Sequence, residues 1–218
     1  MSIEDEPLVT TASVDEVLQA IEAVDLNASW EDVAPKLRLA LPRRRAMPPS
    51  SDDLPTREFP PGVRVGLGLD IGPAMLFVGT DQIAGWGVSA DQAFEQALEN
   101  VRARVASRRQ FALMHEHIGG VPTIAFQSRE GWASSLLLLP DELKRVLGDD
   151  DGLILAPMRD LILQLPIDTE PGFALFLLEE FAEADMNALD LPIFVRLEGE
   201  LHRTLAVPAP APREATMH

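Results

Sequence analysis

Apolar residues recur with a helical period in the middle of the chain. Ser89 and Gln92 have the spacing of a capping box, which marks the beginning of a helix. Acidic residues fill the first half of the following segment and arginines its end near Arg109, as the helix dipole favours. One helix face would carry the apolar residues Phe94, Ala97, Leu98, Val101 and Val105. We therefore predict one long amphipathic helix here.

Similar signals predict a pair of short helices within residues 13–41. Ser13 and Glu16 form a second capping-box pair, ahead of an apolar stripe that extends to about Val24. Ser29 is a suitable N-cap for another helix, with Pro35 in its first turns. The apolar face of that helix would carry Trp30, Val33, Leu37 and Leu41.

Two more helices are predicted in the second half of the chain. Because proline is tolerated in the first turn of a helix, one helix is expected to begin near Pro140 and to stop at Gly148. Another is expected over Phe173–Met186, with Glu179 and Glu183 facing solvent. The opposite, buried face would carry Phe173, Phe176, Leu177, Phe181 and Ala184.

Short apolar runs bounded by glycine or proline predict the strands, and tight turns join several of them into hairpins. Such short connections favour an α+β fold with a mixed, largely antiparallel sheet and packed amphipathic helices. The predicted strands are Val63–Leu69, Ala74–Val78, Phe111–Ile118, Thr123–Ser128, Gly152–Ala156, Leu161–Leu165, Ile193–Leu197 and Leu201–Val207.

Composition suggests how these elements are divided along the chain. Residues 42–61 contain six prolines, which is typical of a stiff linker. We predict a flexible tail at 1–12, the helical pair at 13–41, this linker at 42–61, an α+β core domain at 62–207 and a disordered tail at 208–218.

Charge and cysteine content exclude several classes of function. The chain has no cysteine, so disulfides, thiolate zinc sites and Fe–S clusters are ruled out. Its formal net charge of −17 disfavours binding to nucleic acid or to an anionic membrane. No apolar run approaches the roughly 20 residues of a membrane span, and the N-terminus lacks the features of a secretory signal. We predict a cytoplasmic protein, and the preference for arginine over lysine suggests a bacterial source.

Acidic residues gather in the C-terminal half. Between Asp149 and Glu200 there are 13 acids and two basic residues, Arg159 and Arg196. Such a surface either keeps the protein soluble or attracts a basic partner.

Motifs for metal or cofactor chemistry are weak. His115 and His117 would share one face of a strand, but a metal needs further ligands, and we interpret them as exposed imidazoles rather than a metal site. Asp149-Asp150-Asp151 resembles a calcium loop only in its charge. The sequence contains no dinucleotide, phosphate-loop or nucleophile-elbow motif, so no cofactor is predicted.

The polar residues most suggestive of a site are Asp70, Trp86, Asn100, Arg159 and Asp160. Arg159 and Asp160 follow a buried strand, where charges need partners. Two interpretations remain open. Arg159 pairs with an acid such as Asp70 while Asp160 caps the next turn, or the three line a polar pocket at the strand end.

Several sequence blocks occur in a defined order. Asp70–Arg104 contains Phe77-Val78, Trp86-Gly87-Val88 and Ala97–Asn100, and it is followed by Ala133–Pro140, Ala156–Asp160 and, more loosely, Leu191–Phe194. This order resembles the uncharacterised bacterial YtpQ-like family, in scattered blocks from about Gly62 to Val207. Met158 stands where a small polar residue is expected, and the first 60 residues do not match. The family has no established activity, so the resemblance implies a fold group and no mechanism.

Our leading hypothesis is a non-enzymatic protein that acts by binding another protein. Its helical pair and its acidic C-terminal half are the candidate surfaces. One alternative is an enzyme, such as a hydrolase, or a small-ligand binder with a pocket around Arg159 and Asp160. A second is an assembly subunit that docks through residues 13–41. The oligomeric state is left open.

Overall fold

The computed structural model describes residues 13–25, 28–43, 53–59, 62–72, 74–128, 130–184 and 188–204. Its helices are α1 (Val14–Glu22), α2 (Trp30–Val33), α3 (Thr80–Gly85), α4 (Ala90–Ala106), α5 (Pro140–Leu147) and α6 (Pro171–Ala184), with the 3₁₀ helices η1 (Ala34–Lys36) and η2 (Ala133–Leu138). Its strands are β1 (Leu37–Ala40), β2 (Arg57–Phe59), β3 (Val63–Asp70), β4 (Met75–Phe77), β5 (Leu113–Ile118), β6 (Val121–Gln127), β7 (Gly152–Met158), β8 (Leu161–Leu165), β9 (Phe194–Leu197) and β10 (Glu200–Arg203). The fold is α+β with antiparallel sheets, which confirms the predicted class. Within the described ranges, no helix is both long and apolar enough to cross a membrane.

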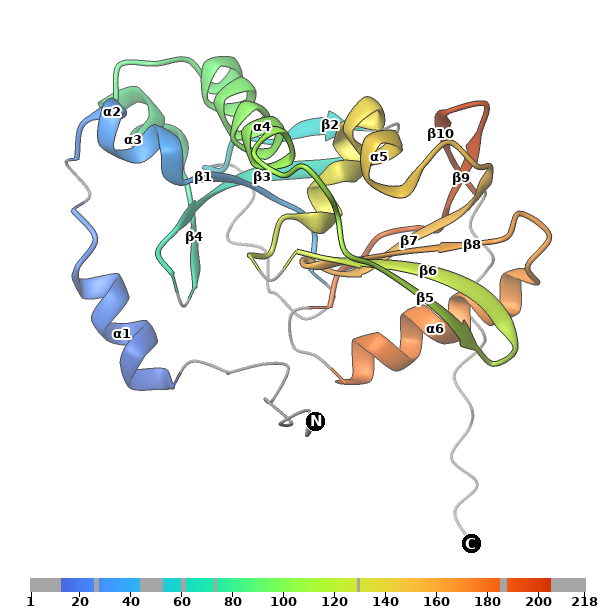
Figure 1. Ribbon diagram of the computed structural model, residues 1–218. Helices are drawn as coiled ribbons and strands as arrows, with labels where there is room; N and C mark the ends of the chain where they lie inside the picture. Colours follow the sequence, from blue (N-terminus) through green and yellow to red (C-terminus); the bar gives the residue numbers. More distant parts are fainter. Residues whose placement is uncertain are drawn as a thin grey trace, which may run out of the picture. The chain divides into compact units, whose positions relative to one another are not determined.

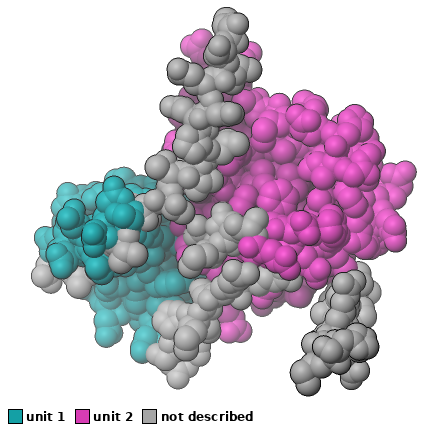
Figure 2. All heavy atoms as spheres, turned by 90° about the horizontal axis from the view of Figure 1, so that it is seen from below, with its two compact units in different colours: residues 1–40, 48–56, 66–100 teal, residues 41–47, 57–65, 101–218 magenta. Residues whose placement is uncertain are grey.

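The chain divides into two compact units (Figure 2). Unit 1 comprises residues 1–40, 48–56 and 66–100, and unit 2 comprises residues 41–47, 57–65 and 101–218. The boundaries of these units differ from those of the helical pair, linker and core domain suggested by composition. The predicted tails at 1–12 and 208–218, together with residues 44–52 and 60–61 of the predicted linker, lie outside the described residues.

Unit 1 is built around residues 66–70 of β3. β1 pairs with this part of the strand in the register Leu37↔Leu69, and β4 pairs with it in the register Leu76↔Leu69. The β3–β4 connection contains Gly72, whose φ of 88° lies in the left-handed region that glycine adopts without strain. The first turns of α4 contribute buried apolar side chains to this unit, including Ala93, Phe94, Ala97 and Leu98.

Unit 2 contains a six-stranded antiparallel sheet in the order β10-β9-β7-β8-β6-β5 (Figure 1). α6 covers one face, and α5 with η2 lies on the opposite face. Because side chains alternate along a strand, Leu153 and Leu155 of β7 face α6 while Ile154 faces the other side. The core beneath α6 consists of Ala125, Leu153, Leu155, Leu161, Leu163, Leu165, Ala174, Leu177 and Ile193.

Several predictions that rest on local signals are confirmed. α4 begins behind the Ser89–Gln92 capping box, in which the Ser89 N–H donates to Gln92 Oε1 (2.8 Å) and the Gln92 N–H donates to Ser89 Oγ (3.2 Å). α5 begins at Pro140 and is capped by Gly148. The predicted hairpins are present as β3–β4, β5–β6 and β9–β10.

The predicted second N-terminal helix is wrong in its second half. Only Trp30–Val33 is α-helical, a 3₁₀ turn containing Pro35 follows, and Leu37–Ala40 is a strand. Proline supplies no N–H to continue a helix, and pairing with β3 satisfies the extended backbone instead. Leu37 and Leu39 are buried whereas Arg38 between them is half-buried, which is the period of a strand. Arg57–Phe59, within the predicted linker, likewise forms a strand.

Candidate functional site

The Asp70 carboxylate lies in unit 1 and forms an ion pair with Arg38. Asp70 Oδ2 is 2.9 Å from Arg38 Nη2, and Asp70 Oδ1 accepts a hydrogen bond from the Gly72 N–H (3.0 Å). The structure thus gives Asp70 a partner that the sequence analysis did not name. The arginine that Asp70 pairs with comes from β1, a segment that the sequence pattern had assigned to a helix.

Asn100 forms hydrogen bonds within unit 1. Its Nδ2 donates to the carbonyl oxygens of Ala34 (2.7 Å) and Leu37 (3.0 Å), and its Oδ1 accepts from Gln96 Nε2 (2.9 Å). These contacts join α4 to the η1–β1 segment, in which the Ala34 oxygen also accepts from the Leu37 N–H and the Leu37 oxygen also accepts from Arg38 Nη1. Asn100 thus has a structural role that accounts for its position.

Trp86 follows α3 and packs against Trp30 of α2. The two ring centroids are 6.2 Å apart, with the ring planes at 45°. The Trp86 Nε1–H is buried and has no acceptor among the residues that the structure describes. Trp86 therefore contributes mainly to the packing of unit 1.

Arg159 and Asp160 form the two-residue turn between β7 and β8 in unit 2. Ser134 donates through both N and Oγ to the Arg159 carbonyl oxygen (3.0 and 2.9 Å). The Asp160 side chain accepts from Gln127 Nε2 (3.2 Å). The Arg159 guanidinium lies over Gly131, where a Cβ would come within 2.6 Å of Nη2. Hydrogen bonds from Gln127 and Ser134 thus hold this turn in place.

His115 and His117 lie on β5, an edge strand of the six-stranded sheet. Both side chains are exposed, as is Glu116 between them. Across the described parts of the chain, no three histidine, aspartate or glutamate side chains are grouped in a way that could hold a metal ion.

Arg196 is a buried cation that the sequence analysis did not single out. Its side chain is 1% exposed, and it donates through Nε to the Asp150 carbonyl oxygen (3.0 Å) and through Nη2 to Gln164 Oε1 (3.1 Å). Burial lowers the pKa of Arg196, while the carboxylates of residues 149–151 act in the opposite direction. Arg196 therefore anchors the acidic 149–151 loop from inside unit 2.

The outer side of α6 carries the most exposed large apolar residue of the described chain, Phe176. Its side chain is 52% exposed, and its ring stacks beside that of Phe173, with centroids 6.4 Å apart and planes at 30°. The sequence pattern had placed Phe176 in the buried face. Leu177 is buried as predicted, Phe173 and Phe181 pack partly buried against the core, and the other buried positions of the helix are Ala174 and Ala182.

Three glutamates continue the same side of the helix. Glu179, Glu180 and Glu183 follow Phe176 by three, four and seven residues, so they share its face, and all three are exposed. We call Phe173, Phe176 and these glutamates the α6 face. The positions of Glu180 and Glu183, four and seven residues after Phe176, indicated in the sequence that Phe176 lies on a polar face of the helix. Phe176 was predicted to be buried because it is an aromatic residue in a largely apolar helix.

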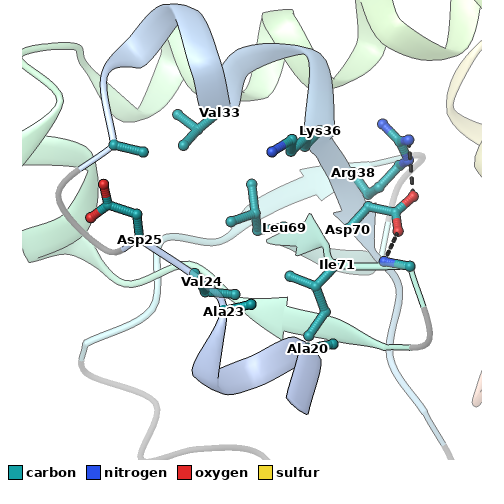
Figure 3. A pocket seen from close by; sticks show the side chains of 12 residues that line it. Ala20, Ala23, Val24, Asp25, Val33, Lys36, Arg38, Leu69, Asp70 and Ile71 are labelled. Carbon is teal, nitrogen blue, oxygen red and sulfur yellow. Dashed lines mark hydrogen bonds and ion pairs between the residues drawn. The ribbon is translucent and has the colours of Figure 1, made fainter. Parts of the chain in front are cut away.

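Unit 1 contains a cavity of about 530 Å³ (Figure 3). α1 and the segment that follows it form one wall, and β1 and the end of β3 form another. Its charged lining consists of Asp25, Lys36 and the Arg38–Asp70 pair. The remaining lining is small or aliphatic: Ala20, Ala23, Val24, Ala28, Val33, Leu69, Ile71 and Gly72. Asp70 is the one predicted site residue in this lining.

Comparisons with family models, with curated proteins and with solved structures give no match to this chain. The resemblance to the YtpQ-like family therefore stays a prediction. The α6 face and the cavity of unit 1 are the candidate sites of the described chain.

Proposed function

We propose that the protein acts by binding another protein and that the α6 face is the surface it uses. The observation that carries this proposal is the exposure of Phe176, which is stacked on Phe173 and followed by three glutamates. Aromatic side chains are enriched at the centres of protein interfaces, where they anchor a partner. The absence of cysteine suits a cytoplasmic setting for this interaction.

Charge indicates the class of partner. α6 contains three glutamates and no basic residue. Of the two arginines between Asp149 and Glu200, Arg196 is buried and hydrogen-bonded within unit 2. A partner segment with an apolar anchor for Phe176 and flanking lysines or arginines would complement this face. Its binding should weaken with added salt, because rim charges are screened within about 10 Å at 0.1 M ionic strength.

Site-specific photo-crosslinking in cells tests the proposal. A photoreactive phenylalanine analogue replaces Phe176 in one variant and Phe77 in a matched control, since Phe77 is a 38% exposed phenylalanine of unit 1. We expect a covalent product from position 176 alone, attached to a partner peptide rich in lysine or arginine. The absence of any product specific to position 176 would refute the proposal.

Affinity measurements with the captured partner then test the two parts of the face. Phe176→Ser should weaken binding about 30-fold, as expected for an anchor that contributes about 2 kcal/mol. Replacing Glu179 and Glu180 with glutamine should remove much of the salt dependence. Phe77→Ser should bind as the wild type does. Equal losses in the Phe77 and Phe176 variants would show that the interaction does not involve α6.

α1 supports a second candidate function, assembly through the N-terminal segment. Two apolar side chains of this helix are exposed, Leu18 by 51% and Ile21 by 40%. If they bury against a second copy, replacing both with serine should lower the mass measured by light scattering. An unchanged mass would remove this candidate. The hypothesis of an enzyme pocket made by Asp70, Arg159 and Asp160 gains no support, because Asp70 is paired with Arg38.

A further inference from the structure

We propose that the cavity of unit 1 binds a small amphipathic anion, with its acidic group beside Lys36 and its aliphatic body on the apolar lining. The volume of about 530 Å³ lies within the roughly 300–1,000 Å³ of small-molecule sites. This ligand site is separate from the α6 face, and neither proposal depends on the other.

The charges of the Arg38–Asp70 pair are already engaged. Arg38 Nη2 meets the Asp70 carboxylate, and Arg38 Nη1 donates to the carbonyl oxygens of Pro35 (3.1 Å) and Leu37 (3.0 Å). The second Asp70 oxygen accepts from the Gly72 N–H. This pair therefore shapes the cavity while leaving little net charge for a ligand to neutralise.

Lys36 is the charge that remains available to a ligand. It is one of two lysines in the chain; the other, Lys144, forms an ion pair with Asp149 (2.7 Å). Within the described residues Lys36 has no ion-pair partner, and Figure 3 shows its side chain between Val33 and Arg38 at the cavity. Asp25, on the opposite side, already has an interaction of its own. The electrostatic attraction of Lys36 for an incoming anion is therefore stronger than that of Asp25 for an incoming cation.

The apolar lining specifies the body of the ligand. Val24, Val33, Leu69 and Ile71 present branched aliphatic side chains to the cavity, without an aromatic ring or a neutral polar group among its lining residues. An aliphatic chain would remove this apolar surface from water, which favours its binding. We therefore assign the ligand to the aliphatic monocarboxylates or related anionic amphiphiles.

The presence of two lysines makes the test specific. Reductive methylation with ¹³C-formaldehyde labels Lys36, Lys144 and the terminal amine, and it keeps their positive charge. The labelled full-length protein is titrated with octanoate, octylammonium and 1-octanol, which share one alkyl chain and differ in head group. We expect octanoate to shift the Lys36 resonance saturably and to leave the Lys144 resonance in place.

Three variants complete the experiment. Lys36→Ala should weaken octanoate binding about fivefold, whereas Lys144→Ala should leave it unchanged. Ala20→Phe places a ring in the cavity from α1 and should abolish binding while the circular dichroism spectrum is retained. Phe176→Ser should bind octanoate normally, which separates this site from the α6 face.

Two outcomes would overturn the proposal. Binding of octylammonium or octanol as tightly as octanoate would show that the site does not select an anion. Octanoate binding that persists in a folded Ala20→Phe protein would show that the cavity is not where the ligand lies.

Discussion

The replacement of Asn100 with aspartate isolates one contact between α4 and the η1–β1 segment. The two side chains have nearly the same volume, so packing is retained while the Nδ2 donor becomes an oxygen. Two hydrogen bonds, to Ala34 O and Leu37 O, are lost. At about 1 kcal/mol each they account for roughly 2 kcal/mol, and leaving two carbonyl oxygens facing a carboxylate adds more. We expect Asn100→Asp to lower the free energy of unfolding by about 2–4 kcal/mol at pH 7.

The effect should depend on pH in a defined direction. The facing carbonyl oxygens disfavour the charged form, so the pKa of the introduced carboxyl is raised in the folded state above its unfolded value of about 3.9. The folded protein then binds more protons than the unfolded chain. The penalty is therefore complete above the folded-state pKa and diminishes as the pH falls through it.

Urea unfolding followed by far-ultraviolet circular dichroism measures the loss in the free energy of unfolding. Faster hydrogen exchange of the β1 amides would show that the loss arises at the η1–β1 segment. Gln110→Glu is the matched control, because it adds the same charge at an exposed position of the chain. A loss below about 0.5 kcal/mol, or an equal loss in the control, would refute the structural role assigned to Asn100. A penalty that grows as the pH falls would refute the assigned electrostatics.

Two further predictions concern local geometry. Gly119→Ala should destabilise unit 2 by about 1–3 kcal/mol in urea unfolding, because φ is 58° and the new Cβ would lie 2.8 Å from Phe173 Cε2. Gly120→Ala should lower the free energy of unfolding by less, because φ is 84° there but no atom lies near the new Cβ. A larger loss for Gly120→Ala than for Gly119→Ala would contradict this prediction. The Ser13 N–H and hydroxyl donate to the Glu16 carboxylate and lower its pKa. The stabilisation from this capping contact is therefore complete above the ordinary glutamate pKa and is lost as the pH falls through the lowered value. Ser13→Ala should raise the pKa of Glu16 measured by nuclear magnetic resonance, and an unchanged pKa would contradict the capping box.

Local signals predicted much of the fold. The capping boxes at Ser13 and Ser89, the proline start of α5 at Pro140 and the glycine turn between β5 and β6 involve residues within four positions of one another. These interactions form within a short segment whatever the rest of the fold is, so the sequence pattern is sufficient to identify them. The fold class followed from the short connections between strands.

The candidate sites were less predictable. Asp70 was named as a site residue and does line the cavity, but its partner Arg38 and the neighbouring Lys36 were not anticipated. Both belong to the segment whose helical pattern was overridden by pairing with β3. Phe176 was assigned to the core, since periodicity describes the two sides of a helix without stating how much of its circumference the sheet covers.

The sequence by itself determined the α+β class, the positions of most elements, the acidic charge and the absence of thiol chemistry. The tertiary structure decided that Leu37–Ala40 is a strand, that Arg38 pairs with Asp70, that Arg196 is buried and that Phe176 is exposed. The reason is the range of the interactions. Capping and turn formation depend on neighbouring residues, whereas strand pairing, ion pairing and burial depend on residues that only folding brings together.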